Sequence, residues 1–296
     1  MKKYKAIIFI LIAGLFSACE DIIDINLSNE MVDLYAIEAK ITTETNPYVY
    51  LYKSQKVNLS DPHQGVSGAT VKISDNSQPA KEITLSESSE KSGYYMVEPG
   101  NQFFGETGKK YTVTIETDGI TITGSDFLAP VEPIDSIQVH SSLRGDHRFL
   151  GVYTFGEEPP GLGSYYKWNV YINNQLLYGS EYLVIASDEF VDGSYVNGFE
   201  IFTDFHDPNK PEDRKIQPGD TIQVKQNSIS AFAYEYYFQM FNQGETGGLF
   251  SVPPANIQSN FTSSDDKPVL GLFTAEDVST SNSVIVDQSI EDQLDD

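Results

Sequence analysis

The stretch KYTVTIETDGITITG at residues 110–124 decides the fold class of this chain. Apolar and polar side chains alternate over 111–117 and again over 120–123, and the pair Asp118-Gly119 separates the two runs. Alternation with a period of two predicts β-strands, and an Asp-Gly pair between two such runs is the strongest short-range signal for a β-hairpin. The sequence therefore predicts a hairpin here and a fold built from β-strands.

The same pattern continues toward the N-terminus. Strand-length runs rich in tyrosine, valine and isoleucine are separated by turn residues, and they cover 34–41, 48–53, 66–73, 82–85 and 93–97. About seven short strands within roughly a hundred residues are typical of a sandwich. The sequence therefore predicts an N-terminal immunoglobulin-like or transthyretin-like β-sandwich over 34–129.

Two prolines, Pro130 and Pro133, interrupt the strand pattern after the sandwich. They predict an extended linker over 130–137. Alternating runs then resume, so we expect a second β-rich domain over 138–286, followed by an acidic tail over 287–296.

One helix is predicted in the second half of the chain, over 231–242. Ser230 precedes it and offers an N-cap, because its hydroxyl can accept a hydrogen bond from a free N–H group of the first turn. Five aromatic side chains of this segment are expected to form a broad face that packs against a sheet: Phe232, Tyr236, Tyr237, Phe238 and Phe241.

The N-terminus has the pattern of an exported lipoprotein. Three lysines within the first five residues precede an apolar run over 6–15, and small side chains stand directly before Cys19. The run is too short to span a bilayer, which takes about 20 residues. Cys19 is the only cysteine of the chain, so it has no partner for an internal disulfide. We expect a signal peptide over 1–18 and acyl chains such as palmitate on Cys19.

The charge of the chain excludes one class of function. The formal net charge is −24, and removal of residues 1–18 takes away three lysines and no acidic residue, which leaves −27. Such a surface repels nucleic-acid phosphates and anionic lipid headgroups. We therefore expect no nucleic-acid partner and a small-molecule or peptide ligand. Cationic or neutral ligands, such as peptides or metal complexes, are favoured over phosphorylated ones.

Short motifs along the mature chain resemble those of the domain of unknown function 4249 family. The quoted motifs are Gly68-Ala69-Thr70-Val71, Gly93-Tyr94-Tyr95, Tyr111-Thr112-Val113, Pro133-Ile134-Asp135-Ser136-Ile137, Ser228-Ile229-Ser230, Tyr234-Glu235-Tyr236-Tyr237, Pro253-Pro254-Ala255-Asn256-Ile257, Asn260 and Leu270-Gly271-Leu272-Phe273. The polar stretch 263–268 departs from the family by its length. The resemblance implies a Bacteroidota lipoprotein, often encoded beside a TonB-dependent receptor, with an accessory role in nutrient capture and no catalytic residues.

Acidic residues follow the lipidation site in the tether expected over 19–33. Glu20, Asp21 and Asp24 are similar to the export signal that directs Bacteroidota lipoproteins to the outer face of the outer membrane. The alternative interpretation is a solvated acidic tether. We expect a lipid-anchored protein of the outer membrane, exposed on the cell surface, with a TonB-dependent receptor as its partner.

The sequence contains candidate residues for ligand and metal binding, and no catalytic motif is found. Tyr165 and Tyr171 lie on one face of the expected strand 165–172, opposite Trp168, and are candidates for ligand binding if that face is exposed. The acidic group Asp188, Glu189 and Asp192 is a candidate for calcium, although its spacing is not that of an EF-hand. The face that carries Trp168 is expected to belong to the core.

Three functions are compatible with these features. The leading hypothesis is a non-enzymatic binding or accessory subunit, without cofactor, for nutrient capture with a TonB-dependent transporter. The second is an adhesin or structural assembly lipoprotein. The third is a hydrolase whose site is assembled from distant acids.

Overall fold

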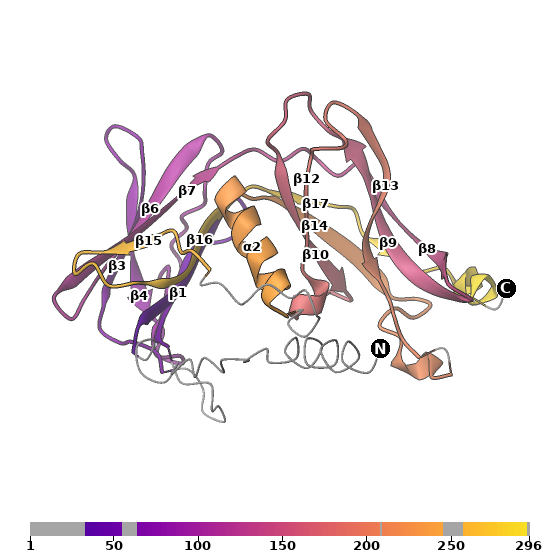
Figure 1. Ribbon diagram of the computed structural model, residues 1–296, viewed down its shortest axis with the longest axis horizontal. Helices are drawn as coiled ribbons and strands as arrows, with labels where there is room; N and C mark the ends of the chain where they lie inside the picture. Colours follow the sequence, from indigo (N-terminus) through magenta and orange to yellow (C-terminus); the bar gives the residue numbers. More distant parts are fainter. Residues whose placement is uncertain (1–32, 55–63, 208, 245–256, 295–296) are drawn as a thin grey trace, which may run out of the picture.

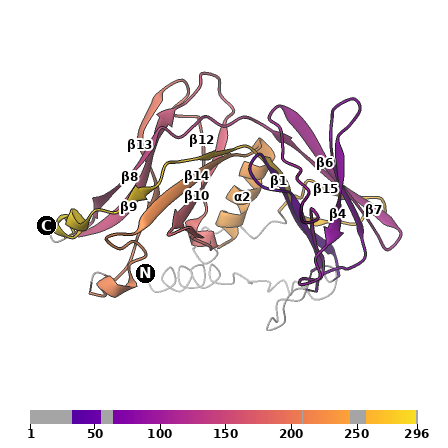
Figure 2. The ribbon, with the colours of Figure 1, turned by 180° about the vertical axis from the view of Figure 1, so that it is seen from behind.

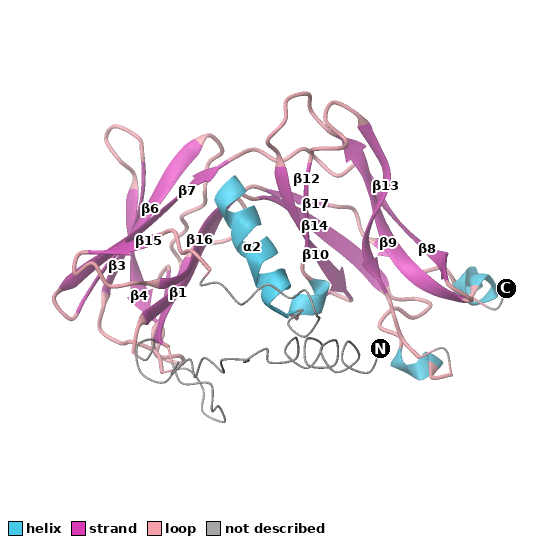
Figure 3. Cartoon of the chain, in the orientation of Figure 1, coloured by secondary structure: helices cyan, strands magenta, loops and turns pink. Residues whose placement is uncertain are grey.

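The computed structural model describes residues 33–54, 64–207, 209–244 and 257–294 of the 296-residue chain. The predicted signal peptide and most of the tether, with Cys19, Glu20, Asp21 and Asp24, lie outside the described residues. Strands dominate the described part and one α-helix crosses it, so the prediction of a mainly β protein is confirmed (Figure 3). None of the helices in the described ranges is long and apolar enough to cross a membrane.

A nine-stranded sheet, built mainly by the N-terminal half of the chain, has the order β15-β7-β6-β3-β4-β5-β2-β1-β16. Its strands are β1 (Tyr35–Thr42), β2 (Tyr48–Lys53), β3 (Thr70–Asp75), β4 (Glu82–Glu87), β5 (Tyr94–Met96), β6 (Lys109–Thr117), β7 (Ile120–Leu128), β15 (Phe261–Ser263) and β16 (Leu270–Glu276). The sheet curls over on itself and encloses a core of alternating aliphatic and aromatic side chains, among them Ile37, Leu51 and Phe273. Burial of each such side chain contributes about 1.5–3 kcal/mol.

The hairpin predicted from Asp118-Gly119 is confirmed. β6 pairs with β7 up to Thr117 and Ile120, and the two residues between them have φ angles of 48° and 77°. Positive φ at both central positions defines the turn type whose twist matches that of the flanking strands. Glycine at 119 adopts this conformation without steric cost.

Two strands from the C-terminal half complete the N-terminal sheet. β16 lies parallel to β1, with Ala36 opposite Leu270, and β15 lies antiparallel to β7. These two strands fall within the range 138–286 that we expected to form a separate domain. They belong instead to the sheet built mainly by residues 35–128. Strand periodicity predicts which residues face a core, but it does not predict the partner of a strand.

The remaining strands form two further sheets. A six-stranded sheet has the order β11-β10-β14-β17, with β12 beside β10 and β18 beside β14, and a three-stranded sheet has the order β13-β9-β8. The strands are β8 (Ser136–Arg144), β9 (His147–Glu157), β10 (Tyr165–Ile172), β11 (Gln175–Leu176), β12 (Val184–Ser187), β13 (Tyr195–Thr203), β14 (Thr221–Ser228), β17 (Val278–Thr280) and β18 (Val284–Ile285). Their shared core contains the buried Trp168 face of β10, as expected.

The α-helix α2 (Ala231–Gly244) lies between the two halves of the molecule (Figures 1 and 2). The Ser230 hydroxyl accepts a hydrogen bond from the Ala233 N–H group at 3.2 Å, which confirms the predicted N-cap. Three short 3₁₀ helices complete the described chain: η2 (Ser180–Tyr182), η3 (Pro211–Asp213) and η4 (Gln288–Gln293).

The aromatic face of α2 differs in part from the prediction. Tyr236 and Tyr237 pack toward the sheets together with the buried Ala233, whereas Phe232 and Phe238 are 38% and 48% exposed. The helix is flanked by sheets on two sides and leaves its outer side to solvent. Consequently only part of its aromatic surface is covered.

Candidate functional site

A groove of about 600 Å³ runs between the two halves of the molecule. This volume lies within the range of about 300–1,000 Å³ that small-molecule sites occupy. We call it the tyrosine groove. Its walls are β1, β2 and β16 on one side, β10 and the β11–β12 connection on the other, and α2 between them. The residues that line it are Ile37, Glu38, Ala39, Lys40, Tyr48, Tyr52, Lys167, Asn169, Tyr171, Leu176, Leu177, Tyr178, Gly179, Tyr182, Leu183, Tyr236, Tyr237, Met240, Gly271, Leu272 and Thr274.

The alternation of β2 directs its tyrosines toward the groove side of the sheet. Val49 and Leu51 are fully buried in the core, so Tyr48, Tyr50 and Tyr52 stand on the opposite face. Their rings lie close together, with the centroids of Tyr50 and Tyr52 4.9 Å apart. Tyr48 in turn stacks on Tyr94 of β5 at 5.5 Å. The result is an aromatic platform on the outer face of the N-terminal sheet.

A single exposed carboxylate, Glu38, stands beside this platform. The hydroxyl of Tyr48 donates a hydrogen bond to its Oε1 atom at 2.6 Å. Burial and the negative charge of Glu38 both raise the pKa of Tyr48, and the same two causes raise the pKa values of Tyr52 and Tyr236. These phenols are therefore neutral at physiological pH and can act as hydrogen-bond donors.

Lys40 and Lys167, which line the groove, belong to a buried charge cluster centred on Glu276 of β16. Lys167 of β10 donates to its Oε1 at 2.5 Å, Asn227 of β14 donates to its Oε2 at 2.9 Å, and Lys40 of β1 lies 3.9 Å from Oε2. Burial alone would raise the pKa of Glu276, but the charges of Lys167 and Lys40 outweigh it and lower the pKa to about 2. This cluster connects the two sheets and so positions the opposite walls of the groove.

The two aromatic residues proposed from the sequence occupy different places. Tyr171 lines the tyrosine groove, and the Lys225 ammonium lies 5.7 Å from its ring centroid. Tyr165 packs against Tyr234 of α2, with ring centroids 5.0 Å apart, in the small core between helix and sheet. The structure thus brings only Tyr171 to the groove.

The acidic residues considered for calcium hold a loop. The Oδ2 atom of Asp188 accepts hydrogen bonds from the N–H groups of Gly163 and Ser164 at 2.8 and 2.9 Å. Asp192 accepts one from Gly161, and Glu189 is exposed. Within the ranges that the structure covers, no group of three or more histidine, cysteine, aspartate or glutamate side chains has the arrangement of a metal site.

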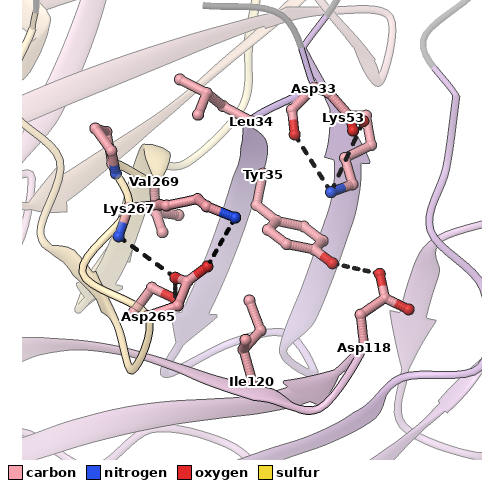
Figure 4. Close-up of a pocket in the computed structure, with 11 residues that line it drawn as sticks. Asp33, Leu34, Tyr35, Lys53, Asp118, Ile120, Asp265, Lys267 and Val269 are labelled. Atoms are coloured by element: carbon pink, nitrogen blue, oxygen red, sulfur yellow. Dashed lines mark hydrogen bonds and ion pairs between the residues drawn. The ribbon is translucent and has the colours of Figure 1, made fainter.

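A smaller pocket of about 240 Å³ lies where the hairpin turn, β1 and the β15–β16 loop meet. Figure 4 shows its polar groups paired with one another. The Tyr35 hydroxyl donates to Asp118 at 2.5 Å, the Lys53 ammonium lies 3.9 Å from an Asp33 carboxylate oxygen, and Lys267 pairs with Asp265 at 3.2 Å. The polar groups of the smaller pocket are thus already paired with one another, and the pocket is less than half the volume of the tyrosine groove. The tyrosine groove is therefore the better candidate for a binding site.

Sequence reasoning missed most of the groove. Glu38, Tyr48 and Tyr52 come from the consecutive strands β1 and β2, whereas Tyr236 comes from α2, which lies far from them along the chain. A signal for part of it is present, because three tyrosines alternate with aliphatic residues over 48–52. That alternation places all three rings on one strand face, opposite the core.

The fold and the groove define a protein of two β-sheet halves, in which C-terminal strands complete the N-terminal sheet and an aromatic groove lies between the halves. Residues 20–282 match the model of the family described as Domain of unknown function (DUF4249), so the chain belongs to this family. The resemblance noted in the sequence is thereby confirmed. No curated protein matches the chain.

Proposed function

We propose that this protein is a lipid-anchored protein of the outer-membrane surface that binds a nutrient in the tyrosine groove and presents it to a TonB-dependent transporter, without catalysing a reaction. The observation that carries the proposal is the groove itself. Its rings, one exposed carboxylate and one partly exposed ammonium are groups that hold a small ligand by stacking and hydrogen bonds.

The rim of the groove supports a binding role. Tyr178, in the β11–β12 connection, is 89% exposed, and Leu176 and Met240 beside the groove are each 40% exposed. Tyrosine offers a rigid, amphipathic contact surface at low cost in conformational entropy. A ligand in the groove would cover these side chains, which are exposed when the groove is empty.

The predicted anchor also supports the proposal. The expected tether over 19–33 leads directly into β1, which lines the groove. Fifteen residues reach at most about 50 Å when fully extended, so the groove would stay near the membrane surface. Anchoring in the plane of a transporter raises the effective concentration of the two proteins and makes a large interface unnecessary.

Co-purification tests this function. The full-length chain with a C-terminal tag is extracted from its native membrane in mild detergent, and we expect an outer-membrane transporter barrel to be recovered with it. A Cys19→Ser variant serves as the comparison, since it is expected to leave the membrane fraction and to lose the barrel. Recovery of the wild-type lipoprotein without any barrel would contradict the transporter role and favour the adhesin hypothesis.

A further inference from the structure

Two opposite charges face the tyrosine groove from the same strand. Glu38 and Lys40 lie on one face of β1, with Cα atoms about 7 Å apart in an extended strand. Within the described structure they form no ion pair with each other. The groove therefore presents one negative and one positive group side by side.

The carboxylate of Glu38 has hydrogen-bonding capacity left for a ligand. Glu38 lines the groove, and among the described residues its hydrogen-bond donor is Tyr48, which uses Oε1, so Oε2 has no donor from this part of the chain. Ring faces in this platform also attract ammonium groups: Lys91 Nζ lies 3.8 Å from the ring centroid of Tyr50. A carboxylate beside tyrosine rings is a favourable place for a ligand ammonium.

The ammonium of Lys40 is only loosely paired. It lies 3.9 Å from Glu276, whose two oxygens already accept from Lys167 at 2.5 Å and from Asn227 at 2.9 Å. Two lysines share one carboxylate in this cluster, which leaves one positive charge uncompensated. The Lys40 side chain is 29% exposed, so it is accessible to a carboxylate in the groove.

We infer that the ligand of the tyrosine groove is a short peptide with free termini, bound with its ammonium at Glu38 and its carboxylate at Lys40. A ligand of one charge alone would pair with one of these groups and be repelled by the other. The volume of about 600 Å³ exceeds what a single free amino acid needs, and the rings and Met240 can accept side chains. This inference rests on the proposed function and names its ligand class.

Calorimetric titration with blocked peptides tests the inference. The probes are the tripeptide Ala-Leu-Ala with free termini, its N-acetylated form and its C-terminal amide. Each block removes one charge-assisted contact, so we expect each to weaken binding by about tenfold or more. Free leucine is expected to bind more weakly than the free tripeptide, and equal affinity would overturn the assignment to a peptide.

Single substitutions assign each terminus to its residue. In Glu38→Gln, the free and the acetylated peptide should bind equally, while the preference for a free carboxylate persists. In Lys40→Gln, the acid and the amide should bind equally, while the preference for a free ammonium persists. A role limited to folding would weaken all three probes in parallel, and that result would overturn the inference.

Matched controls carry the same chemical changes outside the groove. Glu82→Gln and Lys72→Gln alter a surface pair 3.9 Å apart on β4 and β3, and both variants should keep the wild-type preferences. Absence of saturable binding by any probe, or equal binding of free and blocked peptides by the wild type, would also overturn the inference. The co-purification experiment decides the proposed function separately: a recovered barrel without peptide binding leaves that function standing.

Discussion

Replacement of Glu276 by alanine tests whether the buried charge cluster holds the two halves together. The side chain is completely buried and bonds to Lys167, whose own side chain is 4% exposed. The substitution leaves the Lys167 ammonium in the interior without its partner. Breaking a buried pair in this way costs about 3–5 kcal/mol, which is a large share of a typical unfolding free energy of about 5–15 kcal/mol.

The pKa of Glu276 gives a second measure of the same interaction. A fall from the ordinary value of 4.5 to about 2 corresponds to roughly 3 kcal/mol of stabilisation of the charged form. Because the folded-state pKa is lowered, this contribution is complete above pH 4.5 and is lost as the pH falls toward 2. A Glu276→Gln variant should therefore lose less stability than the wild type across this acidic range.

Urea unfolding followed by the fluorescence of Trp168, the single tryptophan, measures the effect. Trp168 is 6% exposed and neighbours Lys167 on β10, so its emission should change when the cluster opens. The control is Glu44→Ala, which removes a more exposed carboxylate that also bridges the halves, by its 2.5 Å contact with Lys225. That variant should lose only about 0–1 kcal/mol.

A double variant separates the loss of the pair from the loss of one charge. Glu276→Leu combined with Lys167→Met removes both charges and should recover most of the stability that Glu276→Ala loses, because no strongly buried charge is then left alone. A single-variant loss below about 1 kcal/mol, or a double variant less stable than Glu276→Ala, would refute the reasoning.

Three further predictions concern the closure of the sheet and the groove. Burial raises the pKa of Asp126 from its ordinary value of 3.8 to about 6. Its contribution to stability is therefore complete below pH 3.8 and is lost as the pH rises through 6. In Asp126→Asn, the free energy of unfolding in urea should no longer show this fall between about pH 4 and pH 7. Gly271→Ala should lower the free energy of unfolding by about 3 kcal/mol or more in the same assay. The φ angle of Gly271 is 107°, and a Cβ atom there would overlap the carbonyl oxygen of Ile37. A loss within about 0.5 kcal/mol would contradict this reasoning. Tyr52→Ala should weaken binding of the tripeptide in calorimetry, whereas Tyr35→Ala, in the smaller pocket, should leave it unchanged.

Local features of the fold were predictable from the sequence. The Asp118-Gly119 hairpin and the N-cap and start of α2 agree with the structure. Each depends on contacts between residues a few positions apart. Such contacts are set by backbone conformation and side-chain chemistry, which are readable from a short stretch.

The sequence by itself determined the mainly β class, the strand faces, the strongly negative charge and the predicted lipid anchor at Cys19. Only the tertiary structure decided that β16 pairs with β1, that Glu276 meets Lys167, and that Glu38, Tyr171 and Tyr236 share one groove. The physical reason is that these contacts join residues from elements that lie far apart along the chain. Any exposed strand edge can accept a partner, and the choice among partners depends on the packing of the whole chain.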